Sequence, residues 1–233
     1  MAIAIIVAGG QGKRFQSNIA KQYLPLAGKP VLSRTLDVFC SCDLIDRIVL
    51  VIPVRDADYC RDNILIHVEP NKPIEIVAGG VYRQESVLNG LEAAGGKNDD
   101  IVLIHDGVRP FLTHVLIRSC IAALESADGV TVAVPATDTL VSSDDEHIVE
   151  RVVDRSSIWH VQTPQAFRYG EILDAHKKAA EQGLRFTDDA SLMTCFGRKV
   201  RVVPGFLRNI KITRPEDMSL ARAIARTFDI DAG

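Results

Sequence analysis

The stretch Ile3-Ala-Ile-Ile-Val-Ala-Gly-Gly-Gln-Gly-Lys-Arg-Phe15 carries most of the information about the fold. Its apolar, mostly β-branched start is typical of a buried strand, and it leads directly into three glycines and two cations. Glycine allows the backbone to place N–H groups against phosphate oxygens. The stretch therefore predicts a strand that ends in a phosphate-binding loop, although an ordinary strand-to-helix turn can have the same residues.

Two widespread phosphate-binding motifs do not match this loop. A P-loop requires G-x-x-x-x-G-K-[ST], and the dinucleotide fingerprint G-x-G-x-x-G would need a third glycine at the position of Phe15. Lys21 follows shortly after the loop and adds its charge to those of Lys13 and Arg14. Glycines combined with these cations indicate a site for a triphosphate.

Composition places the chain among globular proteins. Its 233 residues are 47% hydrophobic and 24% charged, so we expect a single domain over residues 1–233. The net charge of −3 gives no general attraction to nucleic acids or anionic membranes, and we expect neither as a partner. The apolar N-terminal run is too short to span a membrane and lacks the charged start of a signal peptide, which predicts a cytoplasmic location.

The cysteines indicate neither disulfides nor a zinc site. They are odd in number and form no C-x-x-C pair. The five cysteines are Cys40, Cys42, Cys60, Cys120 and Cys195, and most of them lie in apolar or helical contexts. We expect reduced thiols with structural roles.

Short β-branched runs alternate with helical patterns along most of the chain. The runs expected as strands are Ile3–Val7, Ile48–Ile52, Ile74–Val77, Ile101–Ile104, Val130–Val134, Val200–Val203 and Ile210–Thr213. The segments expected as helices are Val31–Cys40, Arg83–Ala94, Val115–Ser126, Tyr169–Gln182, Asp188–Cys195 and Pro215–Thr227. This alternation is typical of an α/β fold with a Rossmann-like, mostly parallel sheet and helices on both faces.

A hairpin interrupts the alternation after Pro135. Thr137–Val141 and Ile148–Val153 are expected to be two strands around the acidic turn Ser142–Glu146, which gives a protruding β-arm at about residues 135–157. A lone two-stranded hairpin is marginally stable in water. We therefore expect the arm to pack on another surface, and a second subunit is a good candidate.

Chemically useful residues follow several predicted strands. Ligands of parallel sheets bind beyond the carboxyl ends of the strands, where this sequence places the glycine loop, the Gly79-Gly80 turn and Asp106. Asp106 suits either a Mg²⁺ ligand or a helix cap. Gly80 and Ser86 either read a base or ribose or form a plain turn. Lys211 lies between two isoleucines, where a lysine points to solvent more often than to an anion.

Several short motifs occur in a fixed order along the chain. They are Ala8–Phe15, Ala20–Tyr23, Gly79–Val87, His105–Pro110, Val153–Arg155, Trp159–Gln165, Thr187–Ser191 and Asn209–Asp217. In this order they resemble the 2-C-methyl-D-erythritol 4-phosphate cytidylyltransferase family, whose patterns are A-A-G-x-G-x-R-[MF], P-K-Q-Y, G-G-x-x-R-x-x-S-V, H-D-x-x-R-P, V-D-R, W-x-x-Q-T-P-Q, T-D-[DE]-A-S and N-I-K-[IV]-T-x-P-E-D. The resemblance runs nearly from end to end.

The resemblance implies a homodimeric, Mg²⁺-dependent enzyme of isoprenoid biosynthesis that joins CTP to 2-C-methyl-D-erythritol 4-phosphate and releases pyrophosphate. The catalytic residues that it implies are Arg14, Lys21, Arg155 and Lys211. Those implied for CTP are Ala8, Gly9, Gly10, Gly12, Arg14, Lys21, Gly80 and Ser86. Those implied for the sugar phosphate are Arg109, Lys211, Thr137 and Arg155, the last two from the arm of a partner subunit. Asp106 is the only firm Mg²⁺ ligand implied, since no carboxylate stands beside Asn209.

The chain departs from the family pattern at four places. Gly9 and Ala20 replace an alanine and a proline, which loosens the loop and could weaken CTP binding without changing the chemistry. Gly107-Val108 replace a pair of alanines, and Phe206 lies where a small polar residue is common. Each departure is local.

Two other functions stay open at this point. A ribitol-5-phosphate cytidylyltransferase would share the loop, the strand-end aspartate and the arm, and would differ mainly in its acceptor. A regulatory protein that holds CTP without turnover would be expected to have lost a reacting cation or the metal carboxylate. The chain retains all of these groups: Arg14, Lys21, Asp106 and Lys211. The resemblance therefore favours an enzyme, with methylerythritol phosphate as the expected acceptor.

Overall fold

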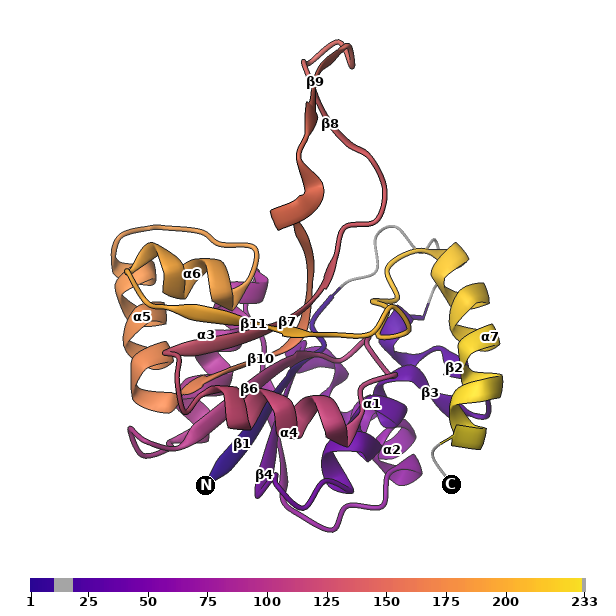
Figure 1. Ribbon diagram of the computed structural model, residues 1–233. Coiled ribbons are helices and arrows are strands. Elements are labelled where there is room, and N and C mark those ends of the chain that lie inside the picture. Colours follow the sequence, from indigo (N-terminus) through magenta and orange to yellow (C-terminus); the bar gives the residue numbers. More distant parts are fainter. Residues whose placement is uncertain (11–18, 232–233) are drawn as a thin grey trace.

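A computed structural model of the chain describes residues 1–10 and 19–231. A seven-stranded sheet in the order β11-β7-β10-β6-β1-β4-β5 lies at its centre (Figure 1). Its strands are β1 (Ala2–Val7), β4 (Arg47–Ile52), β5 (Ile74–Ala78), β6 (Ile101–Asp106), β7 (Gly129–Pro135), β10 (Trp159–Arg168) and β11 (Val200–Pro204). Neighbouring strands are parallel except where β10 pairs with β6 and β7. The predicted α/β fold with a mostly parallel sheet is confirmed.

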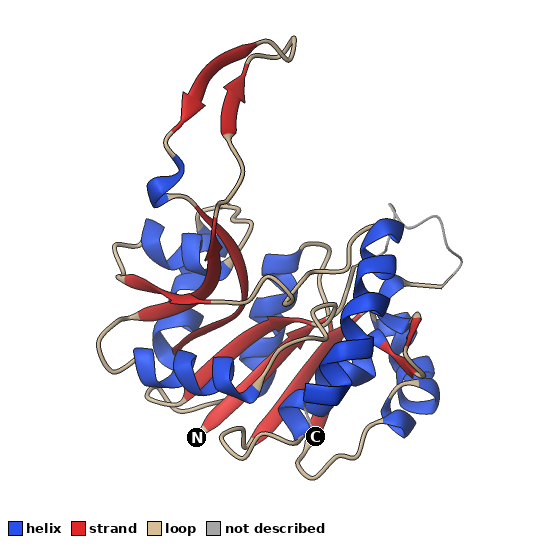
Figure 2. Ribbon diagram, turned by 45° about the vertical axis from the view of Figure 1, so that its right-hand side comes forward, coloured by secondary structure: helices blue, strands red, loops and turns tan. Residues whose placement is uncertain are grey.

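Helices flank both faces of this sheet (Figure 2). They are α1 (Val31–Cys40), α2 (Ala57–Asn63), α3 (Arg83–Ala94), α4 (His114–Ala123), α5 (Tyr169–Glu181), α6 (Asp189–Cys195) and α7 (Pro215–Asp231), and 3₁₀ turns lie at Lys21–Tyr23, Val54–Asp56, Leu65–His67 and Arg155–Ser157. Side chains of α1 and α4 join one apolar cluster with Ala4 and Ile6, whereas those of α3, α5 and α6 join a second with Ile3 and Ile5. Because successive residues of a strand point to opposite faces, the wholly apolar β1 supplies both cores.

The strand β10 was not expected from the sequence. This strand runs antiparallel between β6 and β7, and its register with β7 shifts between Val161 and Gln165. Gln162, Thr163 and Gln165 are buried in it and hydrogen-bonded, so no alternation of apolar and polar residues marks the strand. Pro164 also argues against a central strand in a sequence-based reading.

The predicted arm is present and projects from the sheet between β7 and β10 (Figure 1). Its strands β8 (Leu140–Ser143) and β9 (Val149–Val153) pair antiparallel, which confirms the hairpin. The first strand begins at Leu140 rather than at Thr137, and it includes Ser142, which was expected in the turn. The hairpin is therefore shorter than predicted and sits further from the sheet.

Hydrogen bonds define both ends of the arm. At the tip, the Asp144 carboxylate accepts the N–H groups of Glu146 and Ile148 at 3.0 and 2.8 Å, which places the turn later than predicted. At the base, the Ala136 N–H donates to the Ile158 carbonyl at 2.9 Å, next to the point where the last residue of β7 pairs with the first of β10. The chain thus leaves and re-enters the sheet at one place.

A third apolar cluster joins α7 to the small hairpin of β2 (Pro25–Leu26) and β3 (Lys29–Pro30). The prediction of a strand at Ile210–Thr213 is wrong, because this segment belongs to no strand in the described chain. Ile212 is buried in the third cluster instead, and its N–H donates to the Val108 carbonyl at 3.0 Å. Isoleucines at alternate positions are typical of a strand, but of Ile210 and Ile212 only Ile212 is fully buried.

The structure also contains a helix, α2, at a place where no element was expected.

The five cysteines are free thiols. Four of them are buried, in agreement with a structural role, whereas Cys195 is exposed at the end of α6. Of the helices that the structure describes, none combines the length and the apolar composition needed to cross a membrane.

Candidate active site

The carboxyl ends of adjacent strands bring the expected site residues to one edge of the sheet. The register pairs Val7 at the end of β1 with Asp106 at the end of β6, and the Gly107 N–H donates to the Val7 carbonyl at 2.9 Å. The Gly79 N–H donates to the Ile52 carbonyl of β4 at 2.8 Å. The start of the glycine loop, the Gly79 turn and Asp106 are therefore neighbours, as the strand order requires.

Asp106 is buried among three cations. Its Oδ2 lies 2.8 Å from Lys211 Nζ and 3.5 Å from Arg109 Nε, and its Oδ1 accepts a hydrogen bond from Arg83 Nε at 3.2 Å. Burial alone would raise the pKa of this carboxyl, but Arg83, Lys211 and Arg109 hold the pKa well below its usual range. The alternative role as a helix cap is wrong, because Thr113 caps α4. Arg83 also pairs with a second buried carboxylate, Asp189, so three cations face two carboxylates. The site therefore keeps a net positive charge that suits an anion.

The position of Lys211 differs from the expectation. Its sequence pattern favoured solvent, whereas its ammonium contacts Asp106. The segment is held by buried Asn209, whose Nδ2 donates to the Thr163 carbonyl at 2.9 Å. The Asn209 carbonyl accepts from Arg109 Nη1 at 2.8 Å. Lys211 is thus carried into the site by a loop that β10 and Arg109 hold in place.

His105 supports the site from within the sheet. Its Nε2 lies 3.1 Å from the Arg109 carbonyl, and its Nδ1 lies 3.0 Å from Thr163 Oγ1, which accepts the Asp106 N–H at 3.1 Å. A carbonyl can only accept, so Nε2 carries the proton and Nδ1 accepts from the Thr163 hydroxyl. Burial lowers the pKa of His105 to about 4. The neutral ring therefore fixes the backbone on both sides of Asp106.

The turn expected to read cytidine is closed by Ser86. The Ser86 hydroxyl accepts the Gly80 N–H at 3.1 Å and donates to the Tyr82 carbonyl at 3.1 Å. A methyl group built on Gly9 would lie 3.8 Å from the Ser86 oxygen, so this turn and the glycine loop adjoin. The Glu85 carboxylate also accepts the Tyr82 N–H at 3.3 Å. The arrangement places Gly80 and Ser86 beside the start of the glycine loop.

Lys21 lies against the described start of the same loop. It is buried, and a methyl group built on Gly10 would lie 3.8 Å from its Cε. Gln22 Nε2 donates to the Ala8 carbonyl at 2.9 Å, which attaches this turn to the end of β1. Two further residues expected at the triphosphate lie outside the described residues: Gly12 and Arg14.

Two expected sugar-phosphate residues lie on the arm. Thr137 and Arg155 are exposed at its base, where Arg155 Nη1 donates to the Thr137 carbonyl. The structure therefore brings Asp106, Arg109 and Lys211 together within one chain and leaves Thr137 and Arg155 on the projecting hairpin.

Sequence reasoning gave no role to Arg83, which joins two buried carboxylates. Its Nε donates to Asp106, and its Nη1 donates to Asp189 Oδ2 at 2.9 Å across a separation of 106 residues. Burial alone would lower the pKa of Arg83, but Asp189 and Asp106 raise it. Asp189 in turn lies 3.0 Å from His176 Nε2. The motifs containing Arg83 and Asp189 are visible in the sequence, but their spacing does not show that they meet.

The described residues fit a divalent metal ion if phosphates supply most of its ligands. Asp106 is a single carboxylate, and both of its oxygens already contact cations. Across residues 1–10 and 19–231, no three His, Cys, Asp or Glu side chains gather as a metal site. Mg²⁺ commonly takes one or two carboxylates together with substrate phosphates. Asp106 can therefore add one oxygen to an ion that arrives with a polyphosphate.

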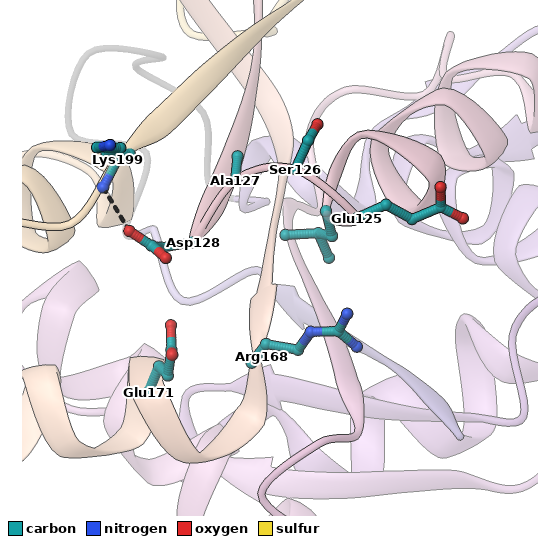
Figure 3. Close-up of a pocket in the computed structure, with 8 residues that line it drawn as sticks. Glu125, Ser126, Ala127, Asp128, Arg168, Glu171 and Lys199 are labelled. Carbon is teal, nitrogen blue, oxygen red and sulfur yellow. Dashed lines mark hydrogen bonds between the residues drawn. The ribbon is translucent and has the colours of Figure 1, made fainter.

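A charged pocket lies at the opposite edge of the sheet (Figure 3). Its lining residues are Leu124, Glu125, Ser126, Ala127, Asp128, Arg168, Glu171 and Lys199. They adjoin the amino ends of β7 and β11, whereas Asp106 stands at the carboxyl end of β6. Asp128 Oδ2 accepts the Lys199 N–H at 2.8 Å, a bond that ties the two strand starts together. This pocket is separate from the Asp106 site.

Comparison with known proteins places the chain in a family. The family model described as "2-C-methyl-D-erythritol 4-phosphate cytidylyltransferase" matches residues 2–227. The protein of that name from Geotalea uraniireducens is 47% identical over 227 residues, 97% of each chain. Its counterpart from Geobacter metallireducens is 47% identical over 225 residues, 96% of this chain and 97% of that one.

The fold agrees with these sequence matches. The crystal structure of 4-diphosphocytidyl-2C-methyl-D-erythritol synthase from Anaerococcus prevotii is similar to this structure with a TM-score of 0.84 at 36% identity, over 97% of this chain and 96% of that one. Sequence and fold therefore match over nearly the whole length. The chain belongs to the 2-C-methyl-D-erythritol 4-phosphate cytidylyltransferase family.

Proposed function

We propose that this protein transfers the cytidylyl group of CTP to 2-C-methyl-D-erythritol 4-phosphate. A phosphate oxygen of the acceptor attacks the α-phosphorus of CTP, and the bond from that phosphorus to the oxygen bridging the β-phosphate breaks. The products are 4-diphosphocytidyl-2-C-methyl-D-erythritol and pyrophosphate. Family membership over residues 2–227 supports the reaction. At the site, the cluster of three cations around Asp106 is the observation that carries it.

The reaction requires little covalent help from the protein. Its two substrates are both anions, so the enzyme must hold them in line and neutralise the charge that builds up on the phosphates. Fixed cations and backbone N–H groups at a sheet edge provide both. The buried, hydrogen-bonded surroundings of Asp106 keep the cations in place before substrate arrives, which lowers the cost of reorganisation.

CTP is proposed to bind along the first loop and the turn beside it. The backbone of the glycine loop would bind the triphosphate through Ala8, Gly9, Gly10 and Gly12, with charge from Arg14 and Lys21. Gly80 and Ser86 would then read the cytidine. Because Ser86 adjoins Gly9, one nucleotide can reach from the base-reading turn to the phosphate loop.

The acceptor phosphate is proposed to bind to Arg109 and Lys211. Both contact Asp106, which balances only part of the positive charge. Thr137 and Arg155 would complete the site from the arm of a second copy of the chain. In that arrangement Lys211 and Arg155 stabilise the transferring phosphate together with Arg14 and Lys21.

We propose that Mg²⁺ accompanies CTP. Asp106 is the residue that would hold the ion at this edge, with phosphates as the other ligands. When bound, the ion neutralises charge on the leaving pyrophosphate. Asp106 itself keeps Lys211 and Arg109 directed to the acceptor side.

The exposed apolar side chains of the arm support a homodimer. Val141, Ile148, Val149 and Val152 are 49%, 62%, 58% and 68% exposed. Two strands without a packed face are marginally stable, so a partner that covers them stabilises the arm. A second copy would also bring Thr137 and Arg155 to the acceptor.

Methylerythritol phosphate is proposed in preference to ribitol 5-phosphate. The relatives described above are named for the former, and the family model carries the same description. A cytoplasmic location is part of the proposal, since five free thiols suit a reducing compartment.

The test is pyrophosphate release from CTP and Mg²⁺ with either acceptor. We expect turnover with methylerythritol phosphate alone, loss of turnover on chelation of Mg²⁺, and loss in Lys21→Ala. Lys29→Ala is the matched control, because it removes the same charge from a half-buried lysine that pairs with Asp37. Turnover with ribitol 5-phosphate would change the acceptor, and no turnover with either would favour a regulatory CTP-binding protein.

A further inference from the structure

We propose that Arg83 is a positioning residue that fixes the Asp106 carboxylate and, through it, Lys211. An ion pair with Asp189, the first residue of α6, holds Arg83 in place. The inference rests on the proposed function, because the ligand whose binding it tunes is the acceptor phosphate. Arg83 acts through Asp106 and not by touching substrate.

Asp189 is fixed by its own surroundings. It is buried, its N–H donates to Gln165 Oε1 at 2.9 Å, and its Oδ1 lies 3.0 Å from His176 Nε2. Its other oxygen is therefore the one that accepts from Arg83 Nη1. Gln165 is anchored in turn, because its Nε2 donates to Thr131 Oγ1 at 2.9 Å. Asp189 thus offers Arg83 a rigid partner in the second core.

Arg83 and Lys211 use different oxygens of Asp106. Arg83 Nε takes Oδ1, so Oδ2 is turned to Lys211 Nζ at 2.8 Å. A carboxylate held on one side has one orientation, and the ammonium that pairs with its other oxygen is placed accordingly. The planar guanidinium reaches two carboxylates at once, which a lysine ammonium at the same position cannot do with this geometry.

The backbone around Arg83 is braced by the segment that precedes α6. Gln84 Nε2 donates to the Leu184 carbonyl at 3.1 Å, and its Oε1 accepts the Phe186 N–H at 2.9 Å. The Arg185 guanidinium lies 3.8 Å from the centre of the Tyr82 ring. Three successive residues of this segment, Leu184, Arg185 and Phe186, therefore contact Tyr82 or Gln84 at the start of α3.

Two substitutions test the proposal through kinetics. Arg83→Lys keeps the positive charge but cannot contact Asp106 and Asp189 at once. Asp189→Asn keeps the shape of the side chain but removes the negative charge that pairs with Arg83. We expect the acceptor KM to rise about tenfold in Arg83→Lys and severalfold in Asp189→Asn, with the CTP KM within about twofold of wild type. Arg198→Lys is the matched control, since Arg198 pairs with Glu171 away from the site.

A double substitution separates positioning from a general loss of stability. If Arg83 acts through Asp106 on Lys211, Arg83→Lys should add almost nothing to the acceptor KM of Lys211→Ala. Additive effects, an unchanged acceptor KM in both single variants, or an equal rise in the CTP KM would each overturn the proposal. Thermal unfolding of every variant shows whether the folded fraction is constant.

Crystal structures of Arg83→Lys and Asp189→Asn give a readout that does not need turnover. Rotation of Asp106 with loss of the Lys211 contact supports the proposal, and an unchanged contact overturns it. Failure of the proposed function is distinguishable, because in that case wild-type protein gives no turnover with CTP and acceptor. The milder Asp189→Asn decides the question if Arg83→Lys does not fold.

Discussion

The Asp106 cluster and the arm differ in whether their side chains find partners within the same chain. In the cluster, Arg83, Arg109 and Lys211 all find their partner carboxylate within the same chain. On the arm, Val141 and Val152 face each other across paired strands and both are exposed. Under the proposed function, this difference means that one half of the site is assembled by the chain itself, whereas a second copy would supply the other half.

Complementation between two inactive variants is the largest effect that we expect. It tests whether one chain supplies Lys211 and another supplies Arg155 to the same site. Lys211→Ala and Arg155→Ala should each lower kcat/KM by about 100- to 1,000-fold, because each removes a cation proposed to stabilise the transferring phosphate. A mixed dimer of the two, isolated with two different tags, should recover about half of wild-type activity, since one of its sites carries both changes and the other none. Initial rates of pyrophosphate release measure this.

The two unmixed variants, tagged in the same way, are the controls and should stay inactive. A mixed dimer as inactive as its parents would mean that Arg155 serves the site of its own chain. The division into an internal and a donated half would then be wrong.

The exposed valines of the arm are expected to form the contact between two copies. Val152→Asp should convert the dimer to monomers and abolish most activity, because a carboxylate would have to be desolvated in the contact. Sedimentation over a range of concentrations measures the assembly. Val54→Asp is the control, since Val54 is 75% exposed on the body of the molecule. A Val152→Asp protein that stays dimeric and active would show that the arm is not the contact.

Buried His105 is expected to make the stability of the fold depend on pH. The pKa of His105 is lowered from 6.5 to about 4, so unfolded chains bind a proton there that folded chains do not. The free energy of unfolding therefore falls as pH falls from about 7 to about 4, and His105 contributes about 2 kcal/mol of that loss between pH 7 and 5. The lowered pKa of Asp106 adds its own loss only at lower pH, below its ordinary 3.8.

Urea unfolding at pH 7 and pH 5 measures this effect. His105→Gln should be less stable than wild type at pH 7 but lose less stability on acidification. His147→Gln, which changes an exposed histidine at the tip of the arm, should keep the wild-type dependence. Equal dependence in all three proteins would contradict the assignment to His105.

The smallest expected effect compares two glycines at the same edge. A methyl group at Gly107 would lie 2.8 Å from Ala8 Cβ and 2.9 Å from Leu32 Cδ1, whereas among the described residues one at Gly9 would meet the Ser86 oxygen alone, at 3.8 Å. Gly107→Ala should therefore lower the free energy of unfolding by about 1–3 kcal/mol, and Gly9→Ala should change it by less than about 0.5 kcal/mol. Urea unfolding at neutral pH compares them, and equal changes would contradict the packing argument.

The parallel part of the fold is readable from the sequence, whereas β10 is not. Strands such as β1 are buried on both faces and therefore appear as continuous apolar runs. The segment of β10 carries Gln162, Thr163 and Gln165, which are buried because hydrogen bonds satisfy them. Those bonds involve residues far away in the sequence, so local patterns do not reveal them. The error at Ile210–Thr213 is the converse: its residues alternate as in a strand, but within residues 1–10 and 19–231 the segment pairs with no strand.

The site shows the same limit. Asp106 and the loops beside it follow strand ends, so topology alone brings them to one edge. Arg83 is different, because its importance comes from two carboxylates that tertiary structure brings to it. Lys211 was expected in solvent, since its isoleucine neighbours say nothing of the carboxylate that Asn209 and its loop bring within reach. Roles that depend on pairs distant in sequence require the fold.

The common exit and entry point of the arm has a consequence for how this molecule can change. Because the last residue of β7 pairs with the first of β10, the hairpin is an excursion whose ends are already joined by the sheet. Its length and sequence can vary, or a tight turn can replace it, without altering the order or register of the central strands. The surface that we propose to contact a partner copy is therefore free to diverge independently of the body that holds the buried charges.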